Sequence, residues 1–211
     1  MDRRSQILRA AARRIARDGV RGLRVTDVAE EAGVSPGLLY YHFTDRSGLL
    51  SATLDYINDH ANEVRSRSGR GDESPYDELE GQLLAELGDD EEVREDSAAW
   101  SELRALAVFE QDLQEPMRRT TATWVDEVAR SVQAVQKSRQ FRSAAGAEDA
   151  TDPVRTATIL TALVEGLSNR WLAGGLSHDE AHSLLSEATG RLVPAGDPTT
   201  TDSAQTPEET P

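Results

Sequence analysis

Helical periodicity constrains this chain more than any other feature of its sequence. Apolar residues recur at helical spacing from Ile7 to Ala16, Gly19 follows where a helix would stop, and no stretch alternates apolar and polar residues as a half-buried strand does. Three later segments begin with a capping side chain followed by proline, whose missing N–H costs nothing in a first helical turn: Ser35-Pro36, Ser74-Pro75 and Asp152-Pro153. The sequence therefore predicts an all-α fold.

We expect about nine helices in a small N-terminal head, residues 1–50, and a larger helical body, residues 51–193. Residues 194–211 contain no apolar residue except alanine and proline, so we predict a disordered tail. The polar connections at 67–73 and 138–152 are expected to be mobile. The predicted helices lie at about 3–18, 26–32, 36–43, 46–66, 75–88, 92–113, 116–137, 153–173 and 178–192.

Composition excludes several classes of protein. Cysteine is absent from the 211 residues, which excludes disulfide scaffolds, thiolate zinc sites, iron–sulfur clusters and cysteine nucleophiles. No window contains the roughly 18 consecutive apolar residues of a membrane-spanning helix. Residues 1–7 run directly into a charged helical pattern without the apolar core of a signal peptide. We therefore expect a cytoplasmic protein with no membrane partner.

Charge is divided unevenly along the chain. Residues 1–50 carry nine arginines and six acidic residues, a net charge of +3, whereas the rest of the chain carries 14 basic and 32 acidic residues, a net charge of −18. Such asymmetry indicates two tasks on one chain. A basic head can bind phosphate while an acidic body is repelled from it, so the overall charge of −15 does not exclude a nucleic acid as partner.

Residues 24–43 have the pattern of two short helices that cross steeply at a tight turn. Gly33 supplies the left-handed residue that ends the first helix, and Ser35-Pro36 begins the second. On a helical wheel, Leu39 and Phe43 of the second helix face inward.

The outward face of this second helix is unusual for a helix in solvent. It presents Gly37, Leu38 and Tyr41, with Tyr40 to one side. Glycine allows another surface to come close, leucine can meet thymine methyl groups, and tyrosine hydroxyls can reach phosphate. The face is therefore suited to contact with DNA. The alternative is a helical hairpin that packs this face on the rest of the protein.

Residues 5–52 resemble the DNA-binding head of the TetR family of bacterial transcriptional regulators. The resemblance rests on the first helix ending at Gly19 and on two longer patterns: Val25-x-Asp27-Val28-Ala29-x-x-Ala32-Gly33-Val34-Ser35, and Leu39-Tyr40-x-His42-Phe43 followed by x-x-Arg46-x-x-Leu49-Leu50. It implies a three-helix head with a helix-turn-helix, an all-helical effector body and a homodimer on an operator in double-stranded DNA, more often a repressor than an activator, with no cofactor.

The same resemblance implies which residues contact DNA. Tyr40 stands at the family's phosphate-contacting tyrosine, and Arg46 stands where the family usually has lysine. Arg24 departs from the family, which commonly has a capping Thr or Ser there, so Thr26 would have to cap the helix or the helix start would have to slip. The implied DNA-contacting set is Arg24, Thr26, Pro36, Gly37, Leu38, Tyr40, Tyr41, His42 and Arg46.

The body contains several aromatic residues that either fill the core or line a cavity for a small-molecule effector. Glu110 falls on the apolar face predicted for the helix at 92–113, so we expect it either to make a buried polar contact with the effector or to form a salt bridge with an arginine such as Arg104 or Arg118. The candidate pocket residues are Trp100, Arg104, Phe109, Glu110, Trp124 and Trp171.

The helix predicted at 153–173 is apolar or small on nearly every side. Between Thr156 and Leu172 only Glu165 and Arg170 are charged. A helix that is apolar all round must be covered all round, and we expect a second subunit to provide part of the cover. A homodimer through the helices at 153–173 and 178–192 is therefore predicted, as the family resemblance also implies. The pattern Trp100…Glu110…Trp124 and the glycine-bearing helix at 153–173 also resemble the BetI-like subgroup of effector domains.

Enzyme and metal chemistry are not predicted. His178 and His182 are four residues apart, but the glutamate of a zinc hydrolase pattern is displaced by one place, and two exposed histidines on a surface helix are expected instead. No serine nucleophile or phosphate-loop motif is present. The sequence favours a ligand-responsive DNA-binding regulator, and the alternative is a helical ligand- or partner-binding protein that does not bind DNA.

Overall fold

The structure is a computed structural model that describes residues 2–68, 74–142 and 151–194, with the backbone alone at 66–68 and 139–142. Within these ranges all regular structure is helical, which confirms the predicted all-α class. The predicted tail beyond Pro194, and residues 69–73 and 143–150 of the connections expected to be mobile, lie outside the described residues. The elements are α1 (Arg3–Asp18), the 3-10 helix η1 (Val20–Gly22), α2 (Val25–Glu31), α3 (Pro36–His42), α4 (Arg46–Ser68), α5 (Pro75–Ala85), α6 (Glu91–Ala107), α7 (Gln111–Arg142), α8 (Pro153–Leu172) and α9 (His178–Leu192).

Side-chain caps begin several helices as the sequence predicts. The backbone N–H of Leu38 donates to Ser35 Oγ at 3.2 Å at the start of α3. Complete capping boxes begin α5, where Ser74 pairs with Asp77, and α9, where the serine and the glutamate of residues 177–180 pair in the same way. Local chemistry therefore sets these helix starts.

The boundary between α6 and α7 differs from the predicted helices at 92–113 and 116–137. α7 already begins at Gln111, and Pro116 lies inside it. Leu113, in the first turn of α7, is fully buried. Proline inside a helix removes one backbone hydrogen bond, and burial of Leu113 in the preceding turn favours the helix despite this cost.

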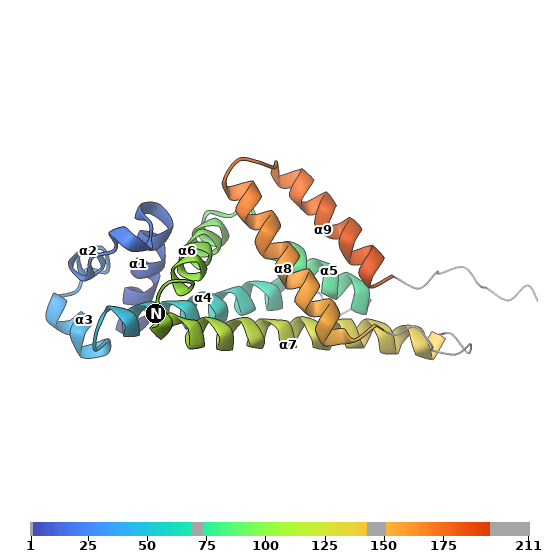
Figure 1. Ribbon diagram of the computed structural model, residues 1–211, viewed down its shortest axis with the longest axis horizontal. Coiled ribbons are helices and arrows are strands. Elements are labelled where there is room, and N and C mark those ends of the chain that lie inside the picture. Colours follow the sequence, from blue (N-terminus) through green and yellow to red (C-terminus); the bar gives the residue numbers. More distant parts are fainter. Residues whose placement is uncertain (1, 69–73, 143–150, 195–211) are drawn as a thin grey trace, which may run out of the picture.

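Three short helices, α1 to α3, form the head at one end of the molecule (Figure 1). The long helices α4 and α7 run side by side along its length, and α5, α8 and α9 gather at the opposite end (Figure 1). α6 lies between the two groups and packs on α1 as well as on α4, α7 and α8. α4 also packs on α1, so two helices of the body are in direct contact with the head.

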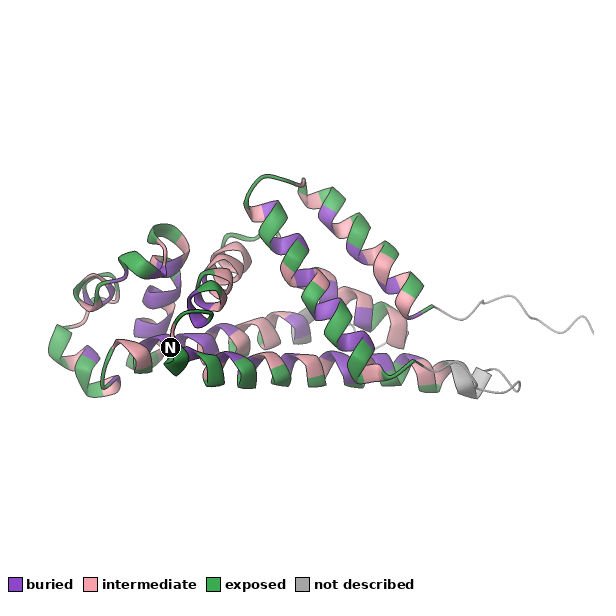
Figure 2. Ribbon diagram, in the orientation of Figure 1, coloured by how far each residue is buried: buried purple, intermediate pink, exposed green. Residues whose placement is uncertain are grey.

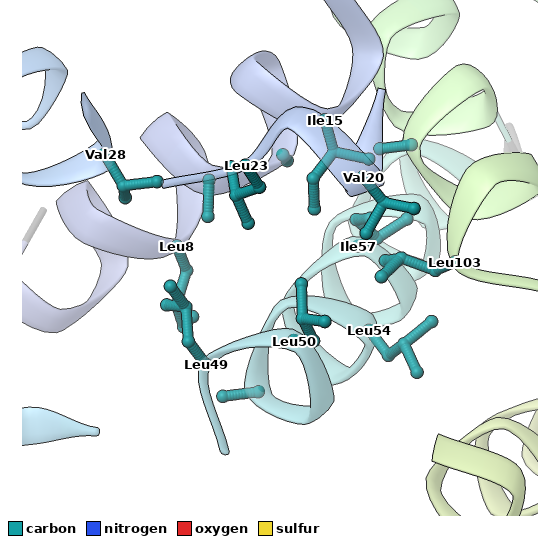
Figure 3. Close-up of a cluster of buried hydrophobic side chains, with 14 of the residues drawn as sticks. Leu8, Ile15, Val20, Leu23, Val28, Leu49, Leu50, Leu54, Ile57 and Leu103 are labelled. Atoms are coloured by element: carbon teal, nitrogen blue, oxygen red, sulfur yellow. The ribbon is translucent and has the colours of Figure 1, made fainter. Parts of the chain in front are cut away.

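Buried apolar side chains form two clusters. The first includes the interiors of α1 to α3 together with residues of α4 and α6, and Figure 3 shows Leu8, Leu50 and Leu103 of this cluster. The second includes residues of α5, α7, α8 and α9. Since Leu103 on α6 belongs to the first cluster, the head shares its core with part of the body. None of the helices in the described ranges is long and apolar enough to cross a bilayer.

Candidate nucleic-acid interface and effector cavity

The turn between α2 and α3 is held by backbone geometry. Gly33 has a φ of 63°, and the N–H of Val34 donates to Ala29 O at 2.9 Å. A positive φ favours glycine because other residues meet a steric penalty there. Leu39 and Phe43 then pack inward, exposed at 1% and 4%. The local sequence therefore forms the helix-turn-helix pair that its pattern predicts.

The opposite face of α3 is open to solvent. Tyr41 is 82% exposed and Tyr40 is 54% exposed, while Pro36 and Gly37 are also exposed. Leu38 is half-buried. This arrangement contradicts the alternative in which the face packs on the rest of the protein. Figure 2 shows the exposed side of α3 at the outer end of the head.

No side chain caps the start of α2, neither that of Arg24 nor that of Thr26. Arg24 occupies the N-cap position without a side-chain hydrogen bond to the helix. The hydroxyl of Thr26 donates to Asp27 Oδ1 at 3.2 Å, so it does not cap the helix either. Arg24 and Thr26 are both exposed, and His42, at the end of α3, is half-buried. All the predicted DNA-contacting residues from 24 to 42 are therefore at least partly open to solvent.

Arg46 and Glu110 lie together, which differs from what the sequence predicts for Glu110. Arg46 Nη2 donates to Val20 O at 2.8 Å, and its Nη1 lies 3.7 Å from a carboxylate oxygen of Glu110. α6 ends before Glu110, so this residue lies in the turn to α7 and not on an apolar helix face. Its predicted partners pair elsewhere: Arg104 with Glu165, and Arg118 with Glu115. Arg46 is therefore engaged within the protein in this structure.

Arginines of α1, which account for much of the positive charge of the head, also form ion pairs within the protein. Four of them form ion pairs with acidic residues of α2 and α6 and hold α1 against these neighbours. The pairs are Arg9–Glu92, Arg13–Glu95 (3.2 Å), Arg14–Glu31 (2.8 Å) and Arg17–Glu31 (3.0 Å).

A cavity of about 70 Å³ lies in the body between α4, α5, α6, α7 and α8. This volume is several times the space that one water molecule requires. Two of the predicted aromatic residues, Trp100 and Trp124, line it together with apolar and charged side chains. The lining residues are Ile57, Asn58, His60, Ala61, Val64, Arg65, Ala85, Glu86, Val93, Asp96, Ser97, Trp100, Ser101, Trp124, Val164, Glu165 and Ser168.

Four other predicted pocket residues do not line the cavity. Phe109 is 74% exposed in the turn after α6, next to Glu110, because α6 ends sooner than its apolar pattern suggests. Trp171 is buried in the second core cluster, where Arg94 covers its ring at 4.7 Å. Arg104 lies behind the cavity wall, with its guanidinium carbon 5.6 Å from the ring centre of Trp100.

Three acidic residues line the cavity that were not among the predicted pocket residues. Burial raises the pKa of each of these carboxyl groups, and a cationic neighbour opposes the shift. The pairs are Glu86 with Arg65, Asp96 with His60 (2.6 Å between Oδ2 and Nδ1) and Glu165 with Arg104. Only Glu165 had a sequence signal, as one of the two charges in an otherwise apolar helix.

Two buried polar atoms of the cavity-lining residues have no hydrogen-bond partner within the structure: Trp124 Nε1 and Ser168 Oγ. Both residues are only 6% exposed. Buried polar groups are nearly always paired, and leaving one unpaired costs about 1–3 kcal/mol. A bound molecule that offers an acceptor can satisfy these groups.

His178 and His182 are half-buried, which corrects the expectation of two exposed histidines. Their Nε2 atoms lie 2.9 and 3.1 Å from the carbonyl oxygen of Leu87. A carbonyl only accepts hydrogen bonds, so each ring donates through Nε2. In the described part of the chain, no group of three or more His, Cys, Asp or Glu side chains is arranged to hold a metal ion.

Two models of known protein families match this chain, one over the head and one over the body. Residues 7–53 match the model for bacterial regulatory proteins of the tetR family, and residues 75–194 match the model for the C-terminal region of BetI-type transcriptional repressors. The chain belongs to the TetR family. It is a ligand-responsive, DNA-binding transcriptional regulator with a BetI-type body, and the alternative without DNA binding is not favoured.

Individual relatives agree with this assignment. The regulators named BetI from Burkholderia thailandensis and Pseudomonas aeruginosa are each 27% identical, over 183 residues (83% of both chains) and 179 residues (84% of this chain and 83% of the relative). A TetR-family regulator from Rhodococcus sp. shares 50% identity with a TM-score of 0.83, over 90% of this chain and 98% of that one.

One structural neighbour contains a bound small molecule. A transcriptional regulator from Saccharomonospora viridis in complex with choline has a TM-score of 0.72 over 87% of this chain and 93% of that one. At 24% identity, this structural similarity shows a common fold and no more.

Proposed function

We propose that α3 enters the major groove of an operator with its Pro36, Gly37, Leu38 and Tyr41 toward the bases. Thr26, Tyr40, His42 and Arg24 lie beside them for contacts with phosphate. The observation that carries this proposal is the contrast across α3: Leu39 is 1% exposed and Tyr41 is 82% exposed. The protein would act in the cytoplasm by binding DNA and would catalyse no reaction.

This proposal is tested by fluorescence anisotropy on an operator obtained by selection from random DNA. Tyr41→Ala should weaken specific binding by about 10- to 100-fold and change which bases are preferred. Tyr40→Phe should weaken binding to all sequences alike. Tyr76→Phe, the same change on α5 far from the head, is the control and should have no effect. If Tyr41→Ala keeps both affinity and base preference, the assignment of α3 is wrong.

We also propose that two copies associate through α8 and α9. Val154, Ile159 and Leu184 on these helices are 51%, 44% and 43% exposed, and the small residues Ala162 and Gly166 are exposed on the same helix as Ile159. An apolar surface of this kind is typical of a subunit interface. Ile159→Arg should convert the dimer to a monomer in analytical ultracentrifugation at micromolar concentration. Val108→Arg, at a 69% exposed valine in the turn after α6, should leave it dimeric.

The effector we propose is a small organic cation held in the cavity. Three carboxyl groups and two tryptophan rings line this space, and aromatic faces with carboxylates attract alkylammonium groups. The choline bound by the Saccharomonospora viridis regulator is a cation of this class. Choline added to the complex with DNA should release the operator, because an effector acts through different affinities for the two states.

A further inference from the structure

The three carboxyl groups of the cavity differ in the kind of cation that neutralises them. Glu86 pairs with Arg65, and Glu165 pairs with Arg104. Arginine keeps its charge throughout the physiological range. Asp96 alone pairs with a histidine, whose charge is lost near neutral pH. Of the three carboxylates, only that of Asp96 can lose its intramolecular counter-charge without moving a side chain.

His60 forms the wall between the cavity and the surface. It lines the cavity together with Asp96, and it also lines an outer groove together with Arg9, Arg13 and Glu92. Its Nδ1 lies 2.6 Å from Asp96 Oδ2, and its Nε2 lies 3.4 Å from Glu92 Oε1. A proton on this ring therefore has a route to solvent on the side away from the cavity.

We propose that a cationic effector enters the cavity in exchange for the proton of His60. Asp96 is the carboxylate that the imidazolium neutralises before binding and that the effector neutralises afterwards. This inference rests on the proposed organic cation as effector. Before binding, the imidazolium neutralises Asp96. After binding, the effector neutralises Asp96, His60 is neutral, and one proton has passed to the solvent. The charge of the site is the same in both states.

Electrostatics favours exchange over simple addition. A cation added beside a protonated His60 would place two positive charges on one buried carboxylate, and an unneutralised buried charge is strongly unfavourable. Arg9 of α1 adds further positive charge on the groove side, while the ring of Tyr56 stacks on His60 at 6.3 Å between centres. The hydrogen bond to Asp96 raises the pKa of His60, so the ring keeps its exchangeable proton to a higher pH than an unpaired histidine does.

The other charged groups around His60 do not take over this role. Glu92 also faces the ring, but it already pairs with Arg9 on α1. Across the cavity, Glu86 and Glu165 have their own arginines. Because Glu92 touches both His60 and Arg9, loss of the proton changes the charge at the contact between α6 and the head.

Isothermal titration of the full chain with choline chloride tests the exchange. Titrations at pH 7 in buffers of different ionisation enthalpy count the protons released on binding. The wild type should release protons on binding, up to one per choline below the pKa of His60, and in that range its affinity should rise by up to about tenfold for each unit increase in pH. His60→Gln should bind choline with no proton release and no such pH dependence. His178→Gln, a histidine outside the cavity, should behave as the wild type.

The possible failures are distinguishable. If the wild type binds choline without releasing a proton, or if His60→Gln releases as much as the wild type, the exchange is wrong while the cationic effector stands. If neither protein binds choline, the proposed effector class fails and the exchange fails with it. The wild-type buffer series needs no variant, so the test survives even if His60→Gln does not fold. Asp96→Asn should reduce choline affinity at least tenfold and abolish proton release.

Discussion

The proposed DNA-recognition surface lies on α2 and α3, within residues 24–42, whereas the cavity is lined by side chains from five helices between residues 57 and 168. The side chains of the surface face solvent, and Tyr41 is exposed at 82%. The charged side chains of the cavity are largely buried, and each pairs with a residue of another helix. Substitutions on the surface can therefore change DNA specificity without affecting the fold, whereas substitutions in the cavity also affect the stability of the body.

The largest loss of stability should come from a substitution among the buried ion pairs of the cavity. Arg65 has 7% of its side chain exposed and pairs with both Glu86 and Glu127. Arg65→Met should lower the free energy of unfolding by about 3–5 kcal/mol, because it leaves buried carboxylates without a counter-charge. The measurement is urea denaturation at fixed protein concentration. Arg65→Met combined with Glu86→Gln should recover part of the loss, and a single variant as stable as the wild type would contradict the comparison.

The next effect separates the two faces of α3. Leu39→Ala removes a side chain that is 1% exposed and should lower the free energy of unfolding by about 2–5 kcal/mol. Tyr41→Ala, on the outer face, should change it by less than about 0.5 kcal/mol. The same urea denaturation measures both. Equal losses for the two variants would show that the outer face is packed in solution.

A smaller effect on stability, from the pair of His60 and Asp96, should depend on pH. The hydrogen bond to Asp96 raises the pKa of His60 in the folded protein. Its contribution to stability is therefore complete below the unfolded pKa and is lost as pH rises through the folded pKa. His60→Gln should be less stable than the wild type by about 1 kcal/mol at pH 6, and the gap should narrow toward pH 9. Thermal unfolding of both proteins across this range measures it, and a gap that widens with pH would be the opposite result.

The smallest effect concerns the contact between the head and the turn after α6. A carboxylate oxygen of Glu110 lies 3.7 Å from Arg46 Nη1, and both side chains are more than a third exposed. Glu110→Gln should change stability by less than about 1 kcal/mol. It should also free Arg46 for phosphate, so operator affinity should rise a few-fold with a steeper salt dependence in anisotropy titrations. Glu115→Gln, which pairs with Arg118 elsewhere on α7, is the matched control.

Local patterns made much of the fold predictable. The capping residues Ser35, Ser74 and Asp152 begin helices as expected, and the inward position of Leu39 and Phe43 follows from helical spacing alone. The α6–α7 boundary was not predictable, because burial of Leu113 competes with the local preference of Pro116. The same error placed Glu110 on an apolar face.

The sequence by itself determined the all-α class, the helix-turn-helix and its outward face, since these depend on residues within a few positions of one another. Only the tertiary structure decided which charges meet. It assigned the α1 arginines to acidic residues of α2 and α6, and it brought His60 to Asp96 across 36 positions of the chain. The physical reason is that helical spacing records which face of a helix is apolar, whereas ion pairs and cavities depend on which helices pack together.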